Sequence, residues 1–310
     1  MDSHQPADTT ASTGRRAALK KLGAGATALW VAPAITTGAS AGVVASPAPG
    51  TCVSTEAELV AALAAATPRS TIVLCATTIP VASEIVLTED VTLVSEGPGL
   101  ATLSGSGTRL LRVDAGATVT LNGITITGRG IANSGALTLL NCIVDGAASD
   151  DSAVRSNGVL AATGTDFRNN ATTGNGGAIW TSGGTLTATA CTFIGNSALG
   201  DGGAVYLRDT TATFTNGVFQ ANAAARDGGA ILAVGSSAFS TPLCSFVGNN
   251  ADPALGAGGA VCHVASGTYT VGATTFTGNL AGIGTAIYRG TNPISLAGAT
   301  FGPGQTVVNP

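Results

Sequence analysis

Lysine is almost missing from this 310-residue chain. Lys20 and Lys21 are the only two, and from residue 42 onward nine arginines face fifteen acidic residues, which gives a net charge of −6. Proteins that bind nucleic acids place several lysines or arginines against the phosphates. This charge balance therefore argues against nucleic acid as a partner.

A long apolar run is missing as well. A helix that crosses a bilayer needs about 20 apolar residues, and the apolar stretch at 22–35 is shorter and rich in glycine and alanine. It follows Arg15-Arg16 and precedes the small residues at 39–41. This order resembles a twin-arginine export signal. We therefore expect residues 1–41 to be a removed signal and the rest to be an extracellular protein without a membrane span.

Helical periodicity is absent, and glycine is abundant, with 44 residues. Instead, F-x-x-N followed by G-G-A (G-T-A in the last copy) and a β-branched residue returns five times, at periods of 26, 26, 27 and 30 residues. A period of this size indicates one supersecondary unit stacked on copies of itself. The repeated phenylalanines are Phe167, Phe193, Phe219, Phe246 and Phe276.

Inside each repeat, apolar and small polar residues alternate with period two, which is typical of short strands. We predict an all-β fold, a right-handed parallel β-helix of about 8–10 coils stacked about 4.8 Å apart. It forms a single domain over 42–310, with an N-terminal cap at 51–90 and regular repeats at 160–290. The two columns expected inside are Leu160, Leu186, Ala212, Phe239, Tyr269 and Ile294, then Ala162, Ala188, Phe214, Thr241, Val271 and Leu296.

Asparagine forms a further column. Its amide can bond to the amides above and below, and asparagine tolerates tight turns. We therefore interpret this column as turn structure without chemistry. Its members are Asn170, Asn196, Asn222, Asn249 and Asn279.

The N-terminal end of the stack has a recognisable cap. Thr55-Glu-Ala-Glu58 is a capping box, and an apolar stripe of Leu59, Val60 and Leu63 follows it. We expect a short helix that covers this end, whereas no similar cap follows the last coil. That open end leaves room for end-to-end self-association.

Two of the six cysteines, Cys52 and Cys75, bracket the capping helix. A disulfide between them suits an exported protein. Cys142, Cys191 and Cys244 fall on one inward column about two coils apart, which is too far for bridging. We expect them to be core residues, and Cys262 has no evident partner.

The strand after each G-G-A carries the residues most suited to binding. A β-branched residue fills one column, beginning with Val154, and we place it inside; Arg155, Trp180 and Tyr206 then face outward. The opposite parity, with the aromatic residues in the core, stays open. Exposed aromatic rings can contact sugars, so we expect a carbohydrate-binding surface made of Trp180, Tyr206, Asp201 and Asp227.

The acidic column just before the glycines allows a second interpretation. Carboxylate and amide oxygens are ligands for Ca²⁺, so a calcium site is an alternative there, although no cofactor is required. Asp-Gly and Asn-Gly are also ordinary turn signals, which explains the same column without a metal. The candidate ligands are Asp150, Asn175, Asp201 and Asp227.

Catalysis is the alternative to binding. Asp150-Asp151 is an adjacent acid pair of the kind that β-helix polygalacturonases use, but those enzymes also need Gly-His-Gly and Arg-x-Lys segments. Neither segment is present, and the one histidine after residue 42, His263, is expected at the surface. A pectate-lyase-like enzyme or a glycoside hydrolase would have to rely on Asp150, Asp151 and Arg155.

The F-x-x-N and G-G-A phrases resemble the repeats of chlamydial polymorphic outer membrane proteins, well over 160–290 and loosely over 91–160. The resemblance implies surface display and adhesion without a cofactor. We therefore expect a secreted, non-catalytic binding or adhesion protein whose partner is an extracellular or cell-surface polysaccharide. A polysaccharide-active enzyme is the second hypothesis. An ice-binding hydroxyl array on Thr187, Thr213, Ser240 and Thr270 is the third.

Overall fold

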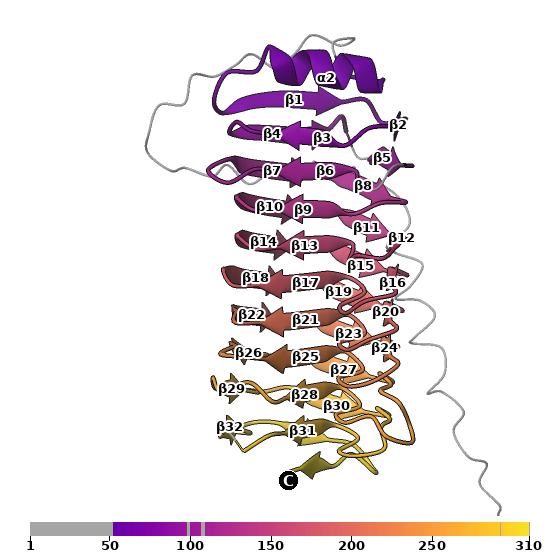
Figure 1. Cartoon of the computed structure of the whole chain (residues 1–310), viewed down its shortest axis with the longest axis vertical. Coiled ribbons are helices and arrows are strands. Elements are labelled where there is room, and N and C mark those ends of the chain that lie inside the picture. Colours follow the sequence, from indigo (N-terminus) through magenta and orange to yellow (C-terminus); the bar gives the residue numbers. More distant parts are fainter. Residues whose placement is uncertain (1–51, 98–99, 107–108, 292, 310) are drawn as a thin grey trace, which may run out of the picture. The chain divides into compact units, whose positions relative to one another are not determined.

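The computed structural model describes residues 52–97, 100–106, 109–291 and 293–309. The predicted export signal at 1–41 lies outside these residues. Within them, the predicted parallel β-helix is confirmed: three ten-stranded sheets run the length of the stack, a four-stranded sheet covers four of its coils, and all strand pairs are parallel (Figure 1). Because consecutive strands belong to different sheets, each coil visits every long sheet once.

Sheet A carries one outward face of the stack. Its strands are paired in the order β1 (Ser70–Leu74), β4 (Val91–Ser95), β7 (Thr118–Asn122), β10 (Ala136–Leu140), β14 (Val159–Thr163), β18 (Thr185–Thr189), β22 (Thr211–Thr215), β26 (Ala238–Ser240), β29 (Tyr269–Thr270) and β32 (Ile294–Ser295).

Sheet B follows sheet A along each coil and carries the repeated phenylalanines. It consists of β2 (Thr78–Val81), β5 (Ala101–Gly105), β8 (Ile124–Thr127), β11 (Ile143–Asp145), β15 (Asp166–Arg168), β19 (Thr192–Ile194), β23 (Val218–Gln220), β27 (Ser245–Val247), β30 (Thr275–Thr277) and β33 (Thr300–Phe301).

Sheet C carries the residues that follow G-G-A, and the short sheet D precedes it in four coils. Sheet C consists of β3 (Ile85–Leu87), β6 (Leu111–Val113), β9 (Ile131–Asn133), β13 (Val154–Ser156), β17 (Ile179–Ser182), β21 (Val205–Arg208), β25 (Ile231–Val234), β28 (Val261–His263), β31 (Ile287–Arg289) and β34 (Val307–Val308). Sheet D consists of β12 (Ala148–Ser149), β16 (Ala171–Thr172), β20 (Ser197–Ala198) and β24 (Ala223–Ala224).

The core is one continuous column of apolar side chains. The five repeated phenylalanines are fully buried, and neighbouring rings stack with centroids 4.6–5.0 Å apart. Phe301 extends this stack by one coil. The predicted inward columns are buried from Leu160 to Tyr269 and to Val271, but Leu296 is 37% exposed. The prediction was wrong there because β32 ends at Ser295 and the chain then turns.

The asparagine column forms a buried amide ladder, as predicted. The Nδ2 of Asn196 donates to the Oδ1 of Asn222 at 3.0 Å, and the same bond joins every neighbouring pair at 2.9–3.0 Å. Each Nδ2 also donates to a backbone carbonyl, such as that of Phe167. All five residues are fully buried, and Gln305 accepts the last bond of the ladder from Asn279 at 2.8 Å.

The glycine pairs are explained by the close approach of successive coils. A Cβ on Gly177 would lie 2.6 Å from the carbonyl oxygen of Gly203, and one on Gly203 would lie 2.2 Å from that of Gly229. No side chain fits at such distances. The second glycine of each pair thus allows neighbouring coils to approach closely just before sheet C.

Helix α2 (Glu56–Ala64) closes the N-terminal end of the stack and lies beside β1 in Figure 1. The predicted capping box is present, since Glu58 N donates to Thr55 Oγ1. Leu59 is fully buried, but Val60 is 50% exposed and does not belong to the apolar stripe. The Glu56 carboxylate accepts hydrogen bonds from the amides of Ala82 and Ser83, which tie the helix to the first coil.

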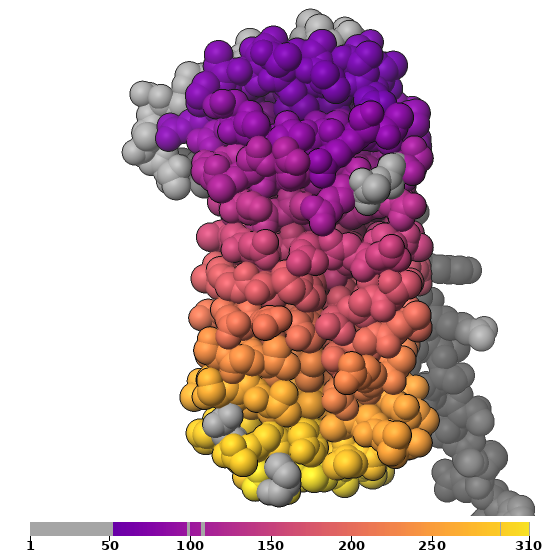
Figure 2. All heavy atoms as spheres, in the orientation of Figure 1, coloured from indigo at the N-terminus to yellow at the C-terminus, as the bar shows by residue number. Residues whose placement is uncertain are grey.

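A disulfide joins Cys52 to Cys75 beside this helix, with Cα atoms 5.0 Å apart, in the pairing that the sequence suggests. In the described part of the chain, no helix is long and apolar enough to cross a membrane. In the space-filling view, the sequence colours form successive bands, because each coil covers a narrow layer of the surface (Figure 2).

Candidate functional site

The outer face of sheet C carries the predicted aromatic column. Val154, Ile179 and Val205 are fully buried, so Arg155, Trp180 and Tyr206, which alternate with them, lie on the outer side. The strand register places Arg155 beside Trp180 and Trp180 beside Tyr206. We call these three residues the sheet C ladder.

In the next two coils, the side chains of this column are buried. Leu232 and Cys262 are only 4% and 1% exposed, although the sequence places them on the outer side. Together with Ala257 they form a small apolar cluster on which Tyr206 packs. The longer period of this repeat supplies Ala257, which pairs with Ile283 and helps to cover the two side chains. The exposed column is therefore interrupted after Tyr206 and resumes only at Tyr288.

The three residues of the ladder lie face to face. The guanidinium carbon of Arg155 is 4.0 Å from the Trp180 ring centroid. On the other side, the Tyr206 ring is parallel to Trp180 within 1°, with centroids 6.3 Å apart. Both faces of the indole are thus covered. A ligand would therefore reach Trp180 and Tyr206 at their edges and polar tips and would not lie flat on the rings.

Tyr206 stays protonated at neutral pH. Partial burial raises the pKa of its phenol, and the carboxylates of Asp201 and Asp209 raise it further, against the opposing effect of Arg208. Since a protonated phenol is both a donor and an acceptor, Tyr206 can bond to hydroxyl groups of a ligand.

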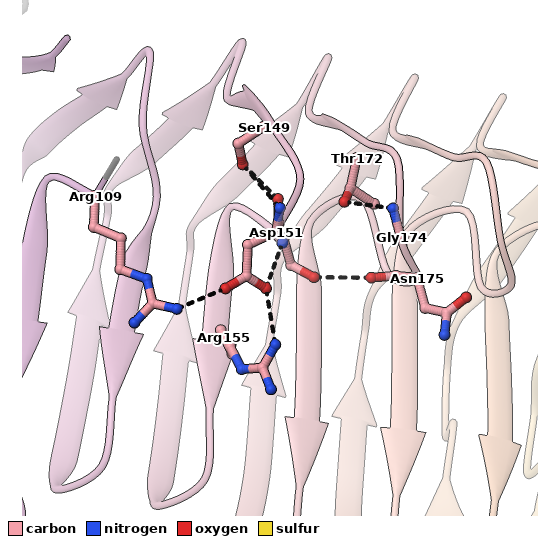
Figure 3. A network of polar contacts seen from close by, with 8 residues as sticks. Arg109, Ser149, Asp151, Arg155, Thr172, Gly174 and Asn175 are labelled. Carbon is pink, nitrogen blue, oxygen red and sulfur yellow. Dashed lines mark hydrogen bonds and ion pairs between the residues drawn. The ribbon is translucent and has the colours of Figure 1, made fainter. Parts of the chain in front are cut away.

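Asp151 is the centre of a polar network at the end of the ladder (Figure 3). Arg109 donates to its Oδ2 at 3.0 Å, and Arg155 donates to its Oδ1 at 3.3 Å. The amide of Ser152 also donates to Oδ1, and the Oγ of Ser149 accepts from the Asp151 amide. The carboxylate therefore holds two arginines in place, and it orients Arg155 over Trp180.

The three candidate catalytic residues are only partly brought together. Asp151 and Arg155 are paired, but Asp150 is exposed and accepts a hydrogen bond from Thr173 instead. Arg109, which sequence reasoning missed, completes the network. It lies 42 residues before Asp151, in a loop outside any repeated column, so no periodic signal marks it.

The acidic column before the glycines is a ladder of turn contacts. Asn175 Oδ1 accepts the amide of Asp201 at 2.7 Å, Asp201 Oδ1 accepts that of Asp227 at 3.2 Å, and Asp227 Oδ1 accepts that of Ala257 at 2.7 Å. One oxygen of each side chain thus holds the next coil. Arg226 lies 3.8 Å from Asp201 and balances its charge.

Metal-ligating side chains gather at one point among the described residues. Only Cys52, Cys75 and Glu96 place ligand atoms of three His, Cys, Asp or Glu residues within 4.8 Å of one another. The two cysteines form the disulfide, so they offer no thiolate to a metal. The predicted calcium ligands do not form such a group.

His263 was expected at the surface, and this was wrong, because it is fully buried. It alternates with Cys262 in β28 and so points into the core, edge-on to Phe239 and Tyr269. Its Nε2 lies 3.0 Å from the carbonyl of Gly267, and its Nδ1 has no partner. Burial lowers the pKa of the imidazole. It cannot reach a ligand on the outer surface.

The four free cysteines are buried. Burial raises the thiol pKa of Cys142, Cys191 and Cys244 to about 11, and raises that of Cys262 as well. Because the thiolate is the reactive form, these residues are inert buried side chains at neutral pH. This confirms the prediction for the first three.

The repeats have known counterparts. The fold is a parallel β-solenoid, and the family model for the Chlamydia polymorphic membrane protein repeat matches residues 164–182 and 190–208. These two segments carry Phe167 and Phe193 and end at the strands of Trp180 and Tyr206. No curated protein matches the chain.

Among solved structures, the chain is similar to a mutant of AlyGC, an alginate lyase of the PL6 family. The two share 14% identity with a TM-score of 0.44. The alignment covers 77% of this chain and 40% of that chain, so this protein spans less than half of the lyase.

Proposed function

We propose that this protein is a secreted, non-catalytic binding protein that attaches to extracellular or cell-surface polysaccharide through the outer face of sheet C. The sheet C ladder carries the proposal: an arginine, a tryptophan and a tyrosine follow one another on three successive coils. Tryptophan, tyrosine and arginine are the residues that contribute most to binding surfaces.

The ligand would be an extended chain that lies along the axis of the stack. The ladder presents a new side chain about every 4.8 Å, which is the spacing of paired strands. Asp201 lies on the coil of Tyr206 and Asp227 on the next coil. Each has one oxygen, Oδ2, that does not bond the neighbouring coil and can accept from a sugar hydroxyl. The phenol of Tyr206 adds a donor. Such a row recognises a polymer better than a single sugar.

The side chains that could act as catalysts are paired or buried within the protein, which supports binding over catalysis. The Asp151 carboxylate is engaged by two arginines and a backbone amide. His263 is buried in the core. A lyase or hydrolase needs an available acid and base beside the scissile bond, and the acid and base that the sequence suggests, Asp151 and Arg155, are paired with each other.

The disulfide Cys52–Cys75 supports a location outside the cytoplasm, where disulfides persist. Surface display and adhesion agree with the matched repeats, whose family is named for membrane proteins. Export through the twin-arginine route is part of this proposal.

The test is the affinity for a panel of soluble plant and bacterial polysaccharides, measured by affinity electrophoresis and calorimetry. For the polymer that binds, the double variant Trp180→Ala/Tyr206→Ala should weaken binding at least about tenfold, or ~1.4 kcal/mol. Tyr288→Ala is the matched control, because Tyr288 lies in the same column two coils beyond Leu232 and should leave the affinity unchanged. Equal affinity of the double variant and the wild type would contradict the proposal.

A further inference from the structure

The outer face of sheet A carries a row of hydroxyl groups that polysaccharide binding through sheet C does not use. Along the ten strands, the central outward position is threonine or serine nine times, and the tenth is Ala161. The strand register runs unbroken through the whole row. Its members are Thr71, Thr92, Thr120, Thr138, Ala161, Thr187, Thr213, Ser240, Thr270 and Ser295.

In the middle of the face, the row widens into a two-dimensional grid. All three outward positions of β18 are threonine, and so are all three of β22. The two strands pair residue for residue, and Figure 1 shows them directly above one another. The repeat is about 4.8 Å across the strands and about 6.7 Å along them. The threonine grid consists of Thr185, Thr187, Thr189, Thr211, Thr213 and Thr215.

The grid is neutral and its hydroxyls are available. None of the outward residues of β10, β14, β18, β22, β26 and β29 is charged. Within the described chain, the grid hydroxyls make one contact, between Thr213 and Ser240 at 3.5 Å. Inward hydroxyls behave differently: Thr210, for example, donates to the carbonyl of Arg208 at 2.8 Å. Apart from that one contact, the grid hydroxyls have no bond to the described chain and face water.

Charged residues flank the N-terminal end of this face. A hollow there is lined by Arg69, Asp90, Val91, Thr92, Thr118 and Thr120. The neutral surface thus begins at β10 and continues over the following coils.

We propose that the neutral outer face of sheet A binds the surface of ice. The matching ligand must be uncharged, flat and periodic in two directions, with hydrogen-bonding groups at both repeats. Ice is such a ligand, because its surface is an uncharged, periodic array of water molecules that donate and accept hydrogen bonds. A threonine hydroxyl can occupy a water position, while its methyl group fills the adjacent gap. Crystalline polysaccharide fits less well, because this face has no aromatic ring.

The test measures thermal hysteresis and the inhibition of ice recrystallisation by the purified full chain. The wild type should inhibit recrystallisation and shape ice crystals. Thr213→Tyr should lose most of this activity, because a ring in the centre of the grid holds the surface away from the lattice. Thr277→Tyr is the control on the exposed outer face of sheet B and should retain it. Circular dichroism confirms that both variants fold.

Three outcomes would overturn the inference: a wild type without effect on ice, equal loss in both tyrosine variants, or Thr213-dependent binding to crystalline cellulose without any effect on ice. The result is independent of the sheet C proposal. Trp180→Ala/Tyr206→Ala should leave activity on ice intact, since those residues belong to another sheet.

Discussion

At the scale of single residues, the environment of a side chain decides its role more than its type does. His263 has the chemistry of a catalyst but sits between Phe239 and Tyr269 in the core. Asp151 has the chemistry of an acid but serves to hold Arg109 and Arg155. Trp180 and Tyr206 have large aromatic side chains that could fill a core, but the strand parity turns them outward.

His263 should make stability depend on pH. Its pKa is lowered by burial, so between the lowered value and the ordinary value of 6.5 the unfolded chain binds a proton that the folded chain does not. The contribution is complete above about pH 6.5 and is lost as the pH falls below it, by at most ~1.4 kcal/mol per pH unit. Urea unfolding of the wild type and of His263→Leu between pH 8 and pH 5 measures this difference. Parallel curves for the two proteins would contradict the account.

At the scale of elements, the columns of buried side chains that join neighbouring coils contribute to the stability of the fold. The buried amide ladder and the phenylalanine stack connect neighbouring coils residue by residue. Removing one member therefore affects the coils on both sides.

Asn222→Ala should destabilise the fold by more than about 2 kcal/mol, because the buried backbone N–H of Asn196 loses its acceptor. The Asn196 amide, the Phe193 carbonyl and the Asn249 Oδ1 each lose one further hydrogen bond. Asn250→Ala provides the matched control. The side-chain oxygen of Asn250 is buried without a partner, so its loss should cost less than about 1 kcal/mol. Denaturant unfolding of the two variants gives the comparison, and similar costs would show that the ladder is not a special source of stability.

The acidic turn ladder gives a prediction about metal. Because Asn175, Asp201 and Asp227 each bond the next coil through a side-chain oxygen, they should hold their geometry without a cation. Removal of calcium with a chelator should leave both the melting temperature and polysaccharide binding unchanged. A fall in either one, restored by added calcium, would reinstate the calcium hypothesis.

At the scale of the molecule, the repeat made the fold predictable. A period of 26 to 30 residues with alternating strands allows few architectures, and the fixed phenylalanine and asparagine columns define the strand register in the sequence itself. The outward position of Trp180 and Tyr206 followed from the β-branched column beside them. Contacts that depend on irregular segments could not be predicted in this way. Arg109 reaches Asp151 from a loop, and Ala257 helps to cover Leu232 and Cys262 from an extended turn.

The most direct measurement of the central claim follows binding and polymer length in one sample. Each polysaccharide is incubated with the wild type and with Trp180→Ala/Tyr206→Ala, after which the bound fraction and the molar mass of the polymer are determined by size-exclusion chromatography with light scattering. The account predicts that the wild type retains a polymer, that the double variant releases it, and that the molar mass stays constant in both. Shortened polymer in the wild-type sample would show that the protein is an enzyme and contradict the claim.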